Sequence, residues 1–308
     1  MELEPYSSFI LIMQQNSKFR QKIILRIFVP FMLAYLLSEL FRNVNGIVGS
    51  IIQSELSLNS KQLGSLTSIF FISVAAAQLF VGVLLDRFGG RRTVALLLLF
   101  CAVGSLIFSS GDLRLMYLGR FLIGLGVAGC WTAAFKTNAQ WWPAEKLAFA
   151  NGAIIGLAGI GALAATLPTQ YLLNAISWQS MFVWCSVATI MVALILWFVA
   201  FDHPSDLVRN SRSFVDELKG FKAVFRNPVF LVFGPLSILG QGAWLSYQGL
   251  WAGAWLREVN NLSALSAAGF LFLLAICVVF GNIVLNSVVM SYQMCYCLSY
   301  YYIYRRCL

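Results

Sequence analysis

The sequence predicts an all-α, polytopic membrane protein with about eight transmembrane helices, and three observations lead to this fold class. Of the 308 residues, 60% are hydrophobic and 11% are charged, and the mean hydropathy is +0.80. Soluble domains are about 45–50% apolar and about 25% charged. The apolar residues also gather in runs of the roughly 20 residues that a helix needs to cross a bilayer. Lys and Arg gather in the gaps between these runs, which argues against a soluble enzyme, a disordered tail and a nucleic-acid-binding module.

Eight apolar runs define the expected helices. They are Ile23–Ile52, Gln62–Leu85, Thr93–Ser110, Leu115–Thr137, Leu147–Leu173, Trp178–Phe201, Val229–Trp255 and Leu265–Met290. Short connections follow the second to fifth runs and predict antiparallel neighbours. The expected units are an N-terminal tail (1–22), a six-helix half (23–201), a polar loop (202–228), two helices of an incomplete second half (229–290) and a tail (291–308).

The polar loop contains its own helical pattern. Phe214, Leu218, Phe221 and Phe225 recur at helical spacing with charged residues between them. This pattern predicts an amphipathic helix on the cytoplasmic membrane surface.

The distribution of basic residues predicts the orientation. Of 21 Lys and Arg residues, 16 fall on one side of the eight expected spans. Lys61, Arg114 and Arg257 fall on the other side, and Arg42 and Arg120 lie within spans. Because Lys and Arg accumulate in cytoplasmic loops, both termini are expected in the cytoplasm. We expect a multi-pass protein of the plasma membrane, of the bacterial inner-membrane type.

The loop after the second run is dense in glycine and charge. Residues 82–92 read GVLLDRFGGRR. Glycines permit a tight reversal and close helix approach, and an acid there can pair with a neighbouring Arg or a helix N-terminus. On charge alone, a generic cytoplasmic loop is the alternative. The candidate signature-loop or gating residues are Gly82, Asp86, Arg87, Gly89, Arg91 and Arg92.

Further motifs lie in the fourth span, in the loop that follows it and at the start of the sixth span. Arg120, Gly124 and Gly126 open the fourth span. The loop after that span reads WWPAE over residues 141–145, and Trp178 opens the sixth span.

With Gly-x3-Asp-Arg-x-Gly between spans two and three and Arg-x3-Gly-x-Gly in span four, the chain resembles the major facilitator superfamily. The resemblance covers nearly Arg20 to Val284, and Gly90 departs from it, since a basic residue is usual there. It implies two six-span halves that rock about a central solute site near the midplane. It also implies a coupling or gating role for Arg120, whereas the physical alternative is a side chain that snorkels to the membrane interface.

Ionisable residues in the first span are the main candidates for solute binding, because such groups are costly within a membrane. Glu39 and Arg42 share a helix face, and Asn43 and Asn45 follow. In a wet cavity a guanidinium can hold a carboxylate or phosphate bidentately. Glu39 would then neutralise Arg42 or carry a proton, and the alternative is an internal pair that satisfies only itself.

The seventh span adds a polar and aromatic stripe. Gln241, Tyr247 and Gln248 are the deeper candidates for solute binding, and an aromatic belt at the outer interface is the alternative. The whole stripe comprises Gln241, Trp244, Tyr247, Gln248, Trp251 and Trp255.

The expected function is secondary active or facilitated transport of a small polar solute by alternating access, with an anion among the candidates because of Arg42. The expected partners are that solute, a coupling proton or sodium ion, and the lipid bilayer. No enzyme activity, cofactor, metal site or nucleic-acid partner is expected, and the absence of a phosphate-binding loop disfavours ATP-driven pumping. Span five lacks the Gly-Pro pair typical of the antiporter subgroup, which favours symport or uniport.

The C-terminal residues differ from the rest of the chain. Six of eleven Tyr lie between Tyr292 and Tyr304, and three of seven Cys lie between Cys295 and Cys307. Such a tail is typical of a shifted reading frame after the eighth span. The alternative function is therefore a truncated, transport-inactive membrane relic or an interaction partner.

Overall fold

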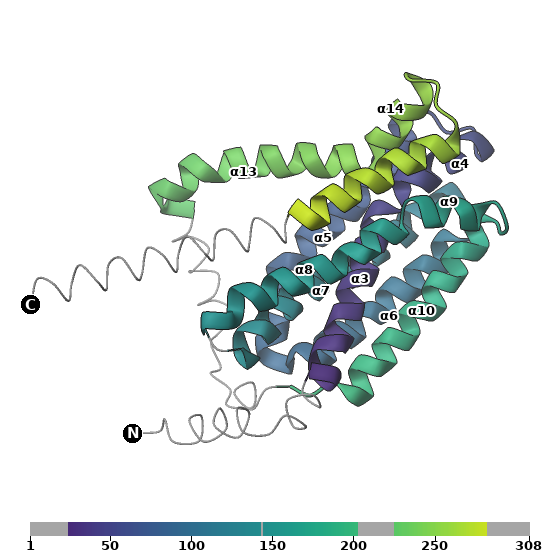
Figure 1. Ribbon diagram of the computed structural model, residues 1–308. Helices are drawn as coiled ribbons and strands as arrows, with labels where there is room; N and C mark the ends of the chain where they lie inside the picture. The colour runs from purple at the N-terminus through teal and green to yellow at the C-terminus, as the bar shows by residue number, and fades with distance from the viewer. Residues whose placement is uncertain (1–23, 143, 203–224, 282–308) are drawn as a thin grey trace, which may run out of the picture.

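The computed structural model describes residues 24–142, 144–202 and 225–281, and over these residues it consists of helices joined by short connections (Figure 1). The all-α fold class predicted from the sequence is confirmed. The predicted N-terminal tail, nearly all of the amphipathic segment and the Tyr- and Cys-rich tail lie outside the described residues.

The helices follow the predicted order. In the first half they are η1 (Ile24–Phe28), α3 (Val29–Asn43), α4 (Asn45–Glu55), α5 (Ser60–Phe88), α6 (Gly90–Phe108), α7 (Leu113–Trp141), α8 (Ala144–Ala164), α9 (Leu167–Leu173) and α10 (Trp178–Val199). In the second half they are α13 (Pro228–Ser246), the π-helical turn η2 (Tyr247–Trp251), α14 (Ala252–Glu258) and a last helix, Ala264–Gly281.

Each of the eight predicted spans is helical over the residues that the structure describes. In the described part of the chain, six helices are long and apolar enough to cross a membrane. A seventh is obtained if Leu25–Asn43 and Asn45–Glu55, which are bent by 42° at Val44, count as one broken span. The predicted seventh span is helical as well, but the π-helical turn η2 interrupts it.

Polar caps explain where several helices begin. Asn59 and Gln62 form a reciprocal capping box at the start of α5. Asp112 accepts backbone N–H bonds at the start of α7, and Ser177 does so at the start of α10. Gly89, with φ of +79°, separates α5 from α6 in a conformation that favours glycine. The sequence therefore sets the breaks that fold the first half into antiparallel helices.

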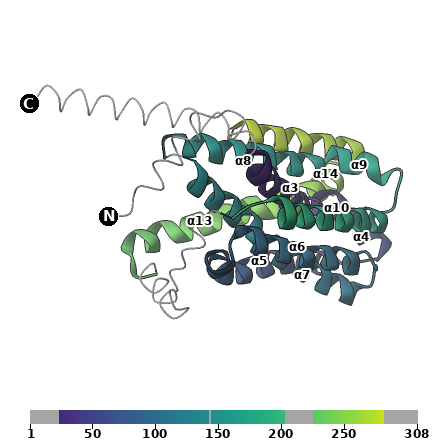
Figure 2. The same ribbon diagram turned by 90° about the horizontal axis from the view of Figure 1, so that it is seen from below.

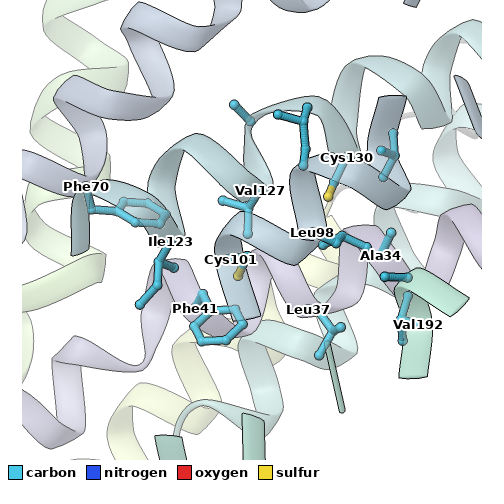
Figure 3. Close-up of a cluster of buried hydrophobic side chains, with 14 of the residues drawn as sticks. Ala34, Leu37, Phe41, Phe70, Leu98, Cys101, Ile123, Val127, Cys130 and Val192 are labelled. Atoms are coloured by element: carbon cyan, nitrogen blue, oxygen red, sulfur yellow. The ribbon is translucent and has the colours of Figure 1, made fainter. Parts of the chain in front are cut away.

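The core lies among α3, α5, α6, α7 and α10 and is almost wholly apolar. Figure 3 shows Phe41 of α3, Leu98 and Cys101 of α6, and Ile123 and Val127 of α7 pointing toward one another. Close helix approach requires glycine where α6 and α7 cross. A Cβ on Gly104 would lie 2.7 Å from the carbonyl oxygen of Gly119, and Gly119 meets Gly104 in the same way. As in other membrane bundles, small residues let the two backbones touch.

The second half lies against this bundle over part of its length. Figure 1 shows α13 standing apart from the bundle at the end where the chain begins, while α14 lies beside α4 at the opposite end. Figure 2, seen from below, places the last helix alongside α8. We call the end that carries α4 and α14 the outer end, following the predicted orientation.

Candidate functional site

A cavity of about 370 Å³ lies between the two halves and contains most of the predicted solute-binding side chains. Both halves contribute to its wall. The lining side chains used below are Tyr35, Glu39, Arg42, Phe70, Trp131, Gln241, Trp244 and Gln248. The last helix closes one side with Ala275 and Val279. The sequence prediction that spans one and seven face a common space is consistent with this arrangement.

Glu39 and Arg42 form an ion pair within the cavity wall. Arg42 Nη1 donates to Glu39 Oε1 at 2.6 Å, and the Arg42 and Glu39 side chains are 19% and 15% exposed, respectively. Asn43 donates to the Glu39 backbone oxygen at 2.8 Å and lies 3.4 Å from Oε2. Among the described residues that line the cavity, these two carry the formal charges. Their charges balance each other, and Arg42 remains partly accessible from the cavity.

Aromatic rings form much of the remaining wall. Tyr35 lies one helical turn before Glu39, and its ring is 5.8 Å from that of Trp131 on α7. Phe70 and Trp244 contribute further faces. Tyr35, Phe70 and Trp131 were not predicted from the sequence. Tyr35 could have been found, because positions 35, 39 and 42 recur on one helix face.

Three predicted solute-binding residues do not line this cavity. Asn43 supports Glu39 instead, and it borders a much narrower space shared with Gln248. Asn45 is buried and donates to Thr67 Oγ1 at 3.0 Å, which joins α4 to α5. Tyr247 is 44% exposed on the π-helical turn. It does not share the cavity wall with Gln241 and Gln248, with which the predicted stripe had grouped it.

Arg120 lies in the core and does not snorkel, so the interface alternative is wrong. It is 1% exposed, and Nη1 donates to the Phe41 backbone oxygen at 3.3 Å. Its guanidinium lies 4.9 to 5.9 Å from the ring centroids of Phe70, Phe108 and Phe182. Arg120 thus supports α3 at the residue before Arg42, immediately below the bend at Val44.

The two glycines of the same motif pack α7 against its neighbours. A Cβ on Gly124 would overlap Ser73 and the Phe70 carbonyl oxygen of α5. A Cβ on Gly126 would overlap Cys101 and Leu97 of α6. The motif in span four therefore sets helix distances around the cavity and lies outside its wall.

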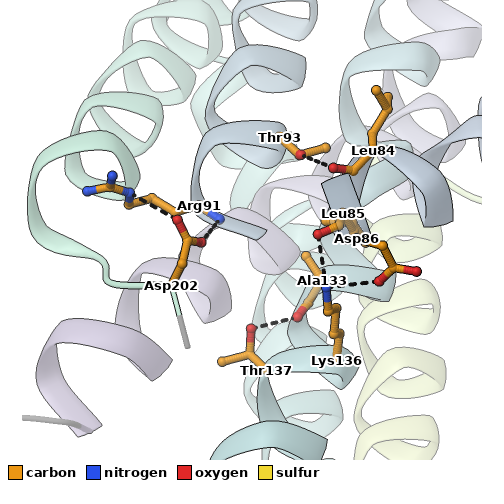
Figure 4. A network of polar contacts seen from close by, with 9 residues as sticks. All are labelled: Leu84, Leu85, Asp86, Arg91, Thr93, Ala133, Lys136, Thr137 and Asp202. Carbon is orange, nitrogen blue, oxygen red and sulfur yellow. Dashed lines mark hydrogen bonds and ion pairs between the residues drawn. The ribbon is translucent and has the colours of Figure 1, made fainter. Parts of the chain in front are cut away.

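The signature loop forms two separate ion pairs at the inner end (Figure 4). Asp86 pairs with Lys136 of α7 at 3.0 Å, and Lys136 also donates to the Leu85 carbonyl oxygen at 2.9 Å. The partner of Asp86 that the structure shows is therefore a lysine of α7, which the sequence had not indicated. The Asp86 side chain is 69% exposed.

Asp202, which the sequence reasoning missed, occupies the helix N-terminus instead. Its Oδ1 accepts the Arg91 backbone N–H at 2.9 Å, and Oδ2 lies 3.5 Å from Arg91 Nε. The carboxylate satisfies an amide in the first turn of α6 and lies at the positive end of the helix dipole. A Cβ on Gly89 would be 2.7 Å from Asp202 Cγ, so glycine is required there for a second reason. Only tertiary folding brings Asp202 here, 111 residues from Arg91.

The other signature-loop residues face outward. Arg87 lies with its guanidinium 5.6 Å from the Phe88 ring centroid, and Arg92 is exposed. A Cβ on Gly82 would meet nothing within 4 Å in the described chain. The expected close helix approach at Gly82 is therefore absent from the described contacts.

Comparisons with known proteins agree with this geometry. The Major Facilitator Superfamily model matches residues 31–294. Over 84% of this chain and 69% of the other, the fold is similar to the xylose transporter XylE from E. coli in a partially occluded inward open conformation, with a TM-score of 0.65 and 16% identity. At that identity the likeness concerns the fold alone.

Among curated proteins, the chain is similar to a probable sulfoacetate transporter of Cupriavidus necator, at 25% identity over 67% of this chain and 47% of that protein. It is also similar to a probable galactarate/D-glucarate transporter of Bacillus subtilis, at 31% identity over 57% and 40%. A probable nitrate/nitrite antiporter of Thermus thermophilus is 26% identical over 65% and 48%. The chain spans about half the length of the curated relatives it matches.

Proposed function

This chain belongs to the Major Facilitator Superfamily and is a multi-pass membrane protein, not an enzyme, and from that premise we propose that it carries a small organic anion across the membrane. The observation that carries the proposal is Arg42, a cation in the wall of a 370 Å³ cavity that both halves line. Transport would proceed by alternating access, with both chain termini in the cytoplasm of a bacterial cell.

The solute class follows from the chemistry of the wall. A carboxylate, sulfonate or similar oxyanion can accept two N–H bonds from one guanidinium. Gln241 and Gln248 supply amide donors and acceptors for hydroxyl groups on the same molecule. The solutes for which these relatives are named support this class, since sulfoacetate, galactarate, D-glucarate and nitrate are all anions.

Glu39 gives the site a replaceable counter-charge. Its carboxylate accepts from Arg42 at 2.6 Å, so an entering anion would compete with Glu39 for the guanidinium. A carboxylate separated from its cation within a membrane is costly, and uptake of a proton removes that cost. We propose that the coupling ion is a proton bound by Glu39, which makes the protein an anion–proton symporter.

The test is uptake into proteoliposomes that contain the full chain, with radiolabelled sulfoacetate and D-glucarate as probes and an imposed pH gradient. In Arg42→Ala we expect uptake to fall about 100-fold, because a buried charged hydrogen-bond partner is worth about 3 kcal/mol. Glu39→Gln should keep exchange of labelled for unlabelled solute and lose accumulation driven by the pH gradient. Arg114→Ala, an exposed outer cation, is the matched control and should behave as wild type.

Two results would contradict the proposal. One is wild-type chain that neither binds nor transports either probe, which is the expectation for the inactive relic. The other is undiminished uptake in Arg42→Ala. Accumulation by Glu39→Gln against a gradient would refute the proton role alone.

A further inference from the structure

We propose that the preferred solute is a singly charged organic anion with a flat apolar body, an aryl carboxylate, and that Trp131 is the residue that selects it. In this arrangement the carboxylate binds Arg42 and the ring lies against Trp131. The proposal rests on the transport function above and names the substrate class of the same cavity. Three features of the described wall carry it: its charge, its polarity and the position of its aromatic rings.

The first feature is that the cavity wall supplies a single positive charge. Arg42 is the one cation among the described residues that line it, and its Nη1 lies 2.6 Å from Glu39 Oε1. A solute with one carboxylate can use this guanidinium fully, since a guanidinium binds both carboxylate oxygens. A second anionic group would lie in the same wall without a cation, and an unpaired charge within a membrane is costly. The wall therefore favours singly charged anions over dianions such as sulfoacetate and D-glucarate.

The second feature is that most of the remaining wall is apolar. Besides the ion pair, Gln241 and Gln248 bring amide groups and Tyr35 brings a phenol. The parts of the wall that α5, α8 and the last helix contribute are apolar, and they include Val74, Ile155 and Val278. A hydroxyl group held against such a wall loses its hydrogen bonds to water without replacement. A polyhydroxylated chain would leave hydroxyl groups in that position, whereas an apolar body is stabilised by the contact.

The third feature is an accessible aromatic surface in this apolar wall. The Tyr35 and Trp131 ring centroids are 5.8 Å apart, and Phe135 stacks on Trp131 at a centroid distance of 5.4 Å and an interplanar angle of 21°. Trp131 is 45% exposed, whereas Cys130 and Ala133 beside it on α7 are fully buried. Aromatic rings attract one another more strongly than their buried area alone accounts for. Trp131 therefore presents a ring surface to a solute that has a ring of its own.

The charge and the rings lie along one helix face. Positions 35, 39 and 42 share a face of α3, so Tyr35 lies two turns, about 10 Å, from Arg42 along the helix axis. An aryl carboxylate bound at Arg42 can extend along this face toward the pair of rings formed by Tyr35 and Trp131. A small anion such as nitrate can bind Arg42 without reaching those rings. Contact with Trp131 thus depends on the body of the solute, which makes this residue a determinant of specificity and not of anion binding itself.

The first test compares ligands on the wild-type full chain in nanodiscs, by equilibrium binding of radiolabelled benzoate with unlabelled competitors. We expect benzoate to bind about tenfold more tightly than D-glucarate, because its ring gains apolar and aromatic contacts and it carries no second charge. Phthalate has the same ring and a second carboxylate, and it should bind about tenfold more weakly than benzoate. Cyclohexanecarboxylate keeps the apolar contact without an aromatic ring, so its affinity should lie between those of benzoate and D-glucarate.

Variants of Trp131 separate ring contact from anion binding. Trp131→Ala should weaken benzoate binding about tenfold and leave nitrate binding unchanged, because only benzoate reaches the ring. Trp131→Phe should recover most of the benzoate affinity. The matched control is Trp184→Ala on α10, which is 66% exposed and lies outside the cavity wall, and it should behave as wild type. Gln241→Arg would add a second cation to the wall and should narrow the difference between phthalate and benzoate.

Tighter binding of D-glucarate or sulfoacetate than of benzoate would overturn the proposal, and this comparison decides even where Trp131→Ala does not fold. An equal loss of benzoate and nitrate binding in Trp131→Ala would also overturn it, since that is the result for a residue that only supports the shape of the cavity. Arg42-dependent sulfoacetate uptake without benzoate binding would refute this inference and leave the proposed function standing. A wild-type chain that binds none of benzoate, nitrate, sulfoacetate and D-glucarate would refute the proposed function itself.

Discussion

The first-half bundle and the second-half helices differ in how they are held. In the apolar parts of α6 and α7, 56% and 61% of residues are buried, whereas in the last helix, as in α5 of the first half, 22% are. Along α13, Phe233, Leu236 and Leu239 are all more than 60% exposed. The first half makes a dense core of its own. The second half contacts it where η2 and α14 pack on α4 and around the cavity wall.

This difference indicates that the residues that stabilise the fold and the residues of the proposed solute site are largely separate. Small residues and a buried cation determine helix distances in the first half. The cavity needs side chains from both halves, including Gln241 and Gln248 of the second. Substitutions in the core of the first half should therefore lower the free energy of unfolding. Equivalent substitutions in the second half should leave it nearly unchanged.

The largest effect is expected at Gly126, where α7 touches α6. In Gly126→Val, the side chain would overlap Cys101 and Leu97, and we expect a loss of about 3 kcal/mol of stability or no folded protein. The matched variant is Gly242→Val on α13, where an added Cβ meets nothing within 4 Å. Thermal unfolding of both variants in detergent measures this difference in stability. Equal unfolding midpoints would contradict the proposed difference between the two halves.

A smaller effect is expected at Arg120. In Arg120→Met the Phe41 carbonyl oxygen loses this donor and three aromatic rings lose their cation, which should cost about 2 kcal/mol. Arg120→Lys keeps the charge and should recover part of the loss. Arg257→Ala, which removes an exposed guanidinium of the second half, should change the unfolding midpoint little. If Arg257→Ala destabilises the chain as much as Arg120→Met, the second half contributes more to the free energy of folding than its low burial indicates.

The fold class and most of the span boundaries could be predicted because they depend on local properties. Apolar length, polar caps and the positions of glycine lie within short stretches of sequence. Asn59 and Asp112 show this at the starts of α5 and α7. The bend at Val44 and the π-helical turn after Ser246 were not predicted from the sequence.

The candidate site was predicted only where charge or spacing revealed it. Glu39, Arg42, Gln241 and Gln248 line the cavity as their types and helix faces indicated. Trp131 was missed because one aromatic residue in an apolar span carries no local signal. For Arg120, snorkelling to the membrane interface remained an alternative because the sequence does not show that three aromatic rings surround it.

The smallest effects are expected at the inner end, where Asp202 lies at the N-terminus of α6 and Asp86 pairs with Lys136. Asp202 caps α6 through the Arg91 backbone N–H, so Asp202→Ala should lower stability by about 1 kcal/mol, the usual value for a lost cap. Asp86 belongs to the recognisable motif, but its pair with Lys136 is largely exposed, so Asp86→Ala should cost no more than about 0.5 kcal/mol. Denaturant or thermal unfolding of the two variants side by side measures the difference, and added salt should reduce the Asp86 effect further. The reverse order would mean that the motif residue, and not the acid that folding brings to the helix start, stabilises this end of the bundle.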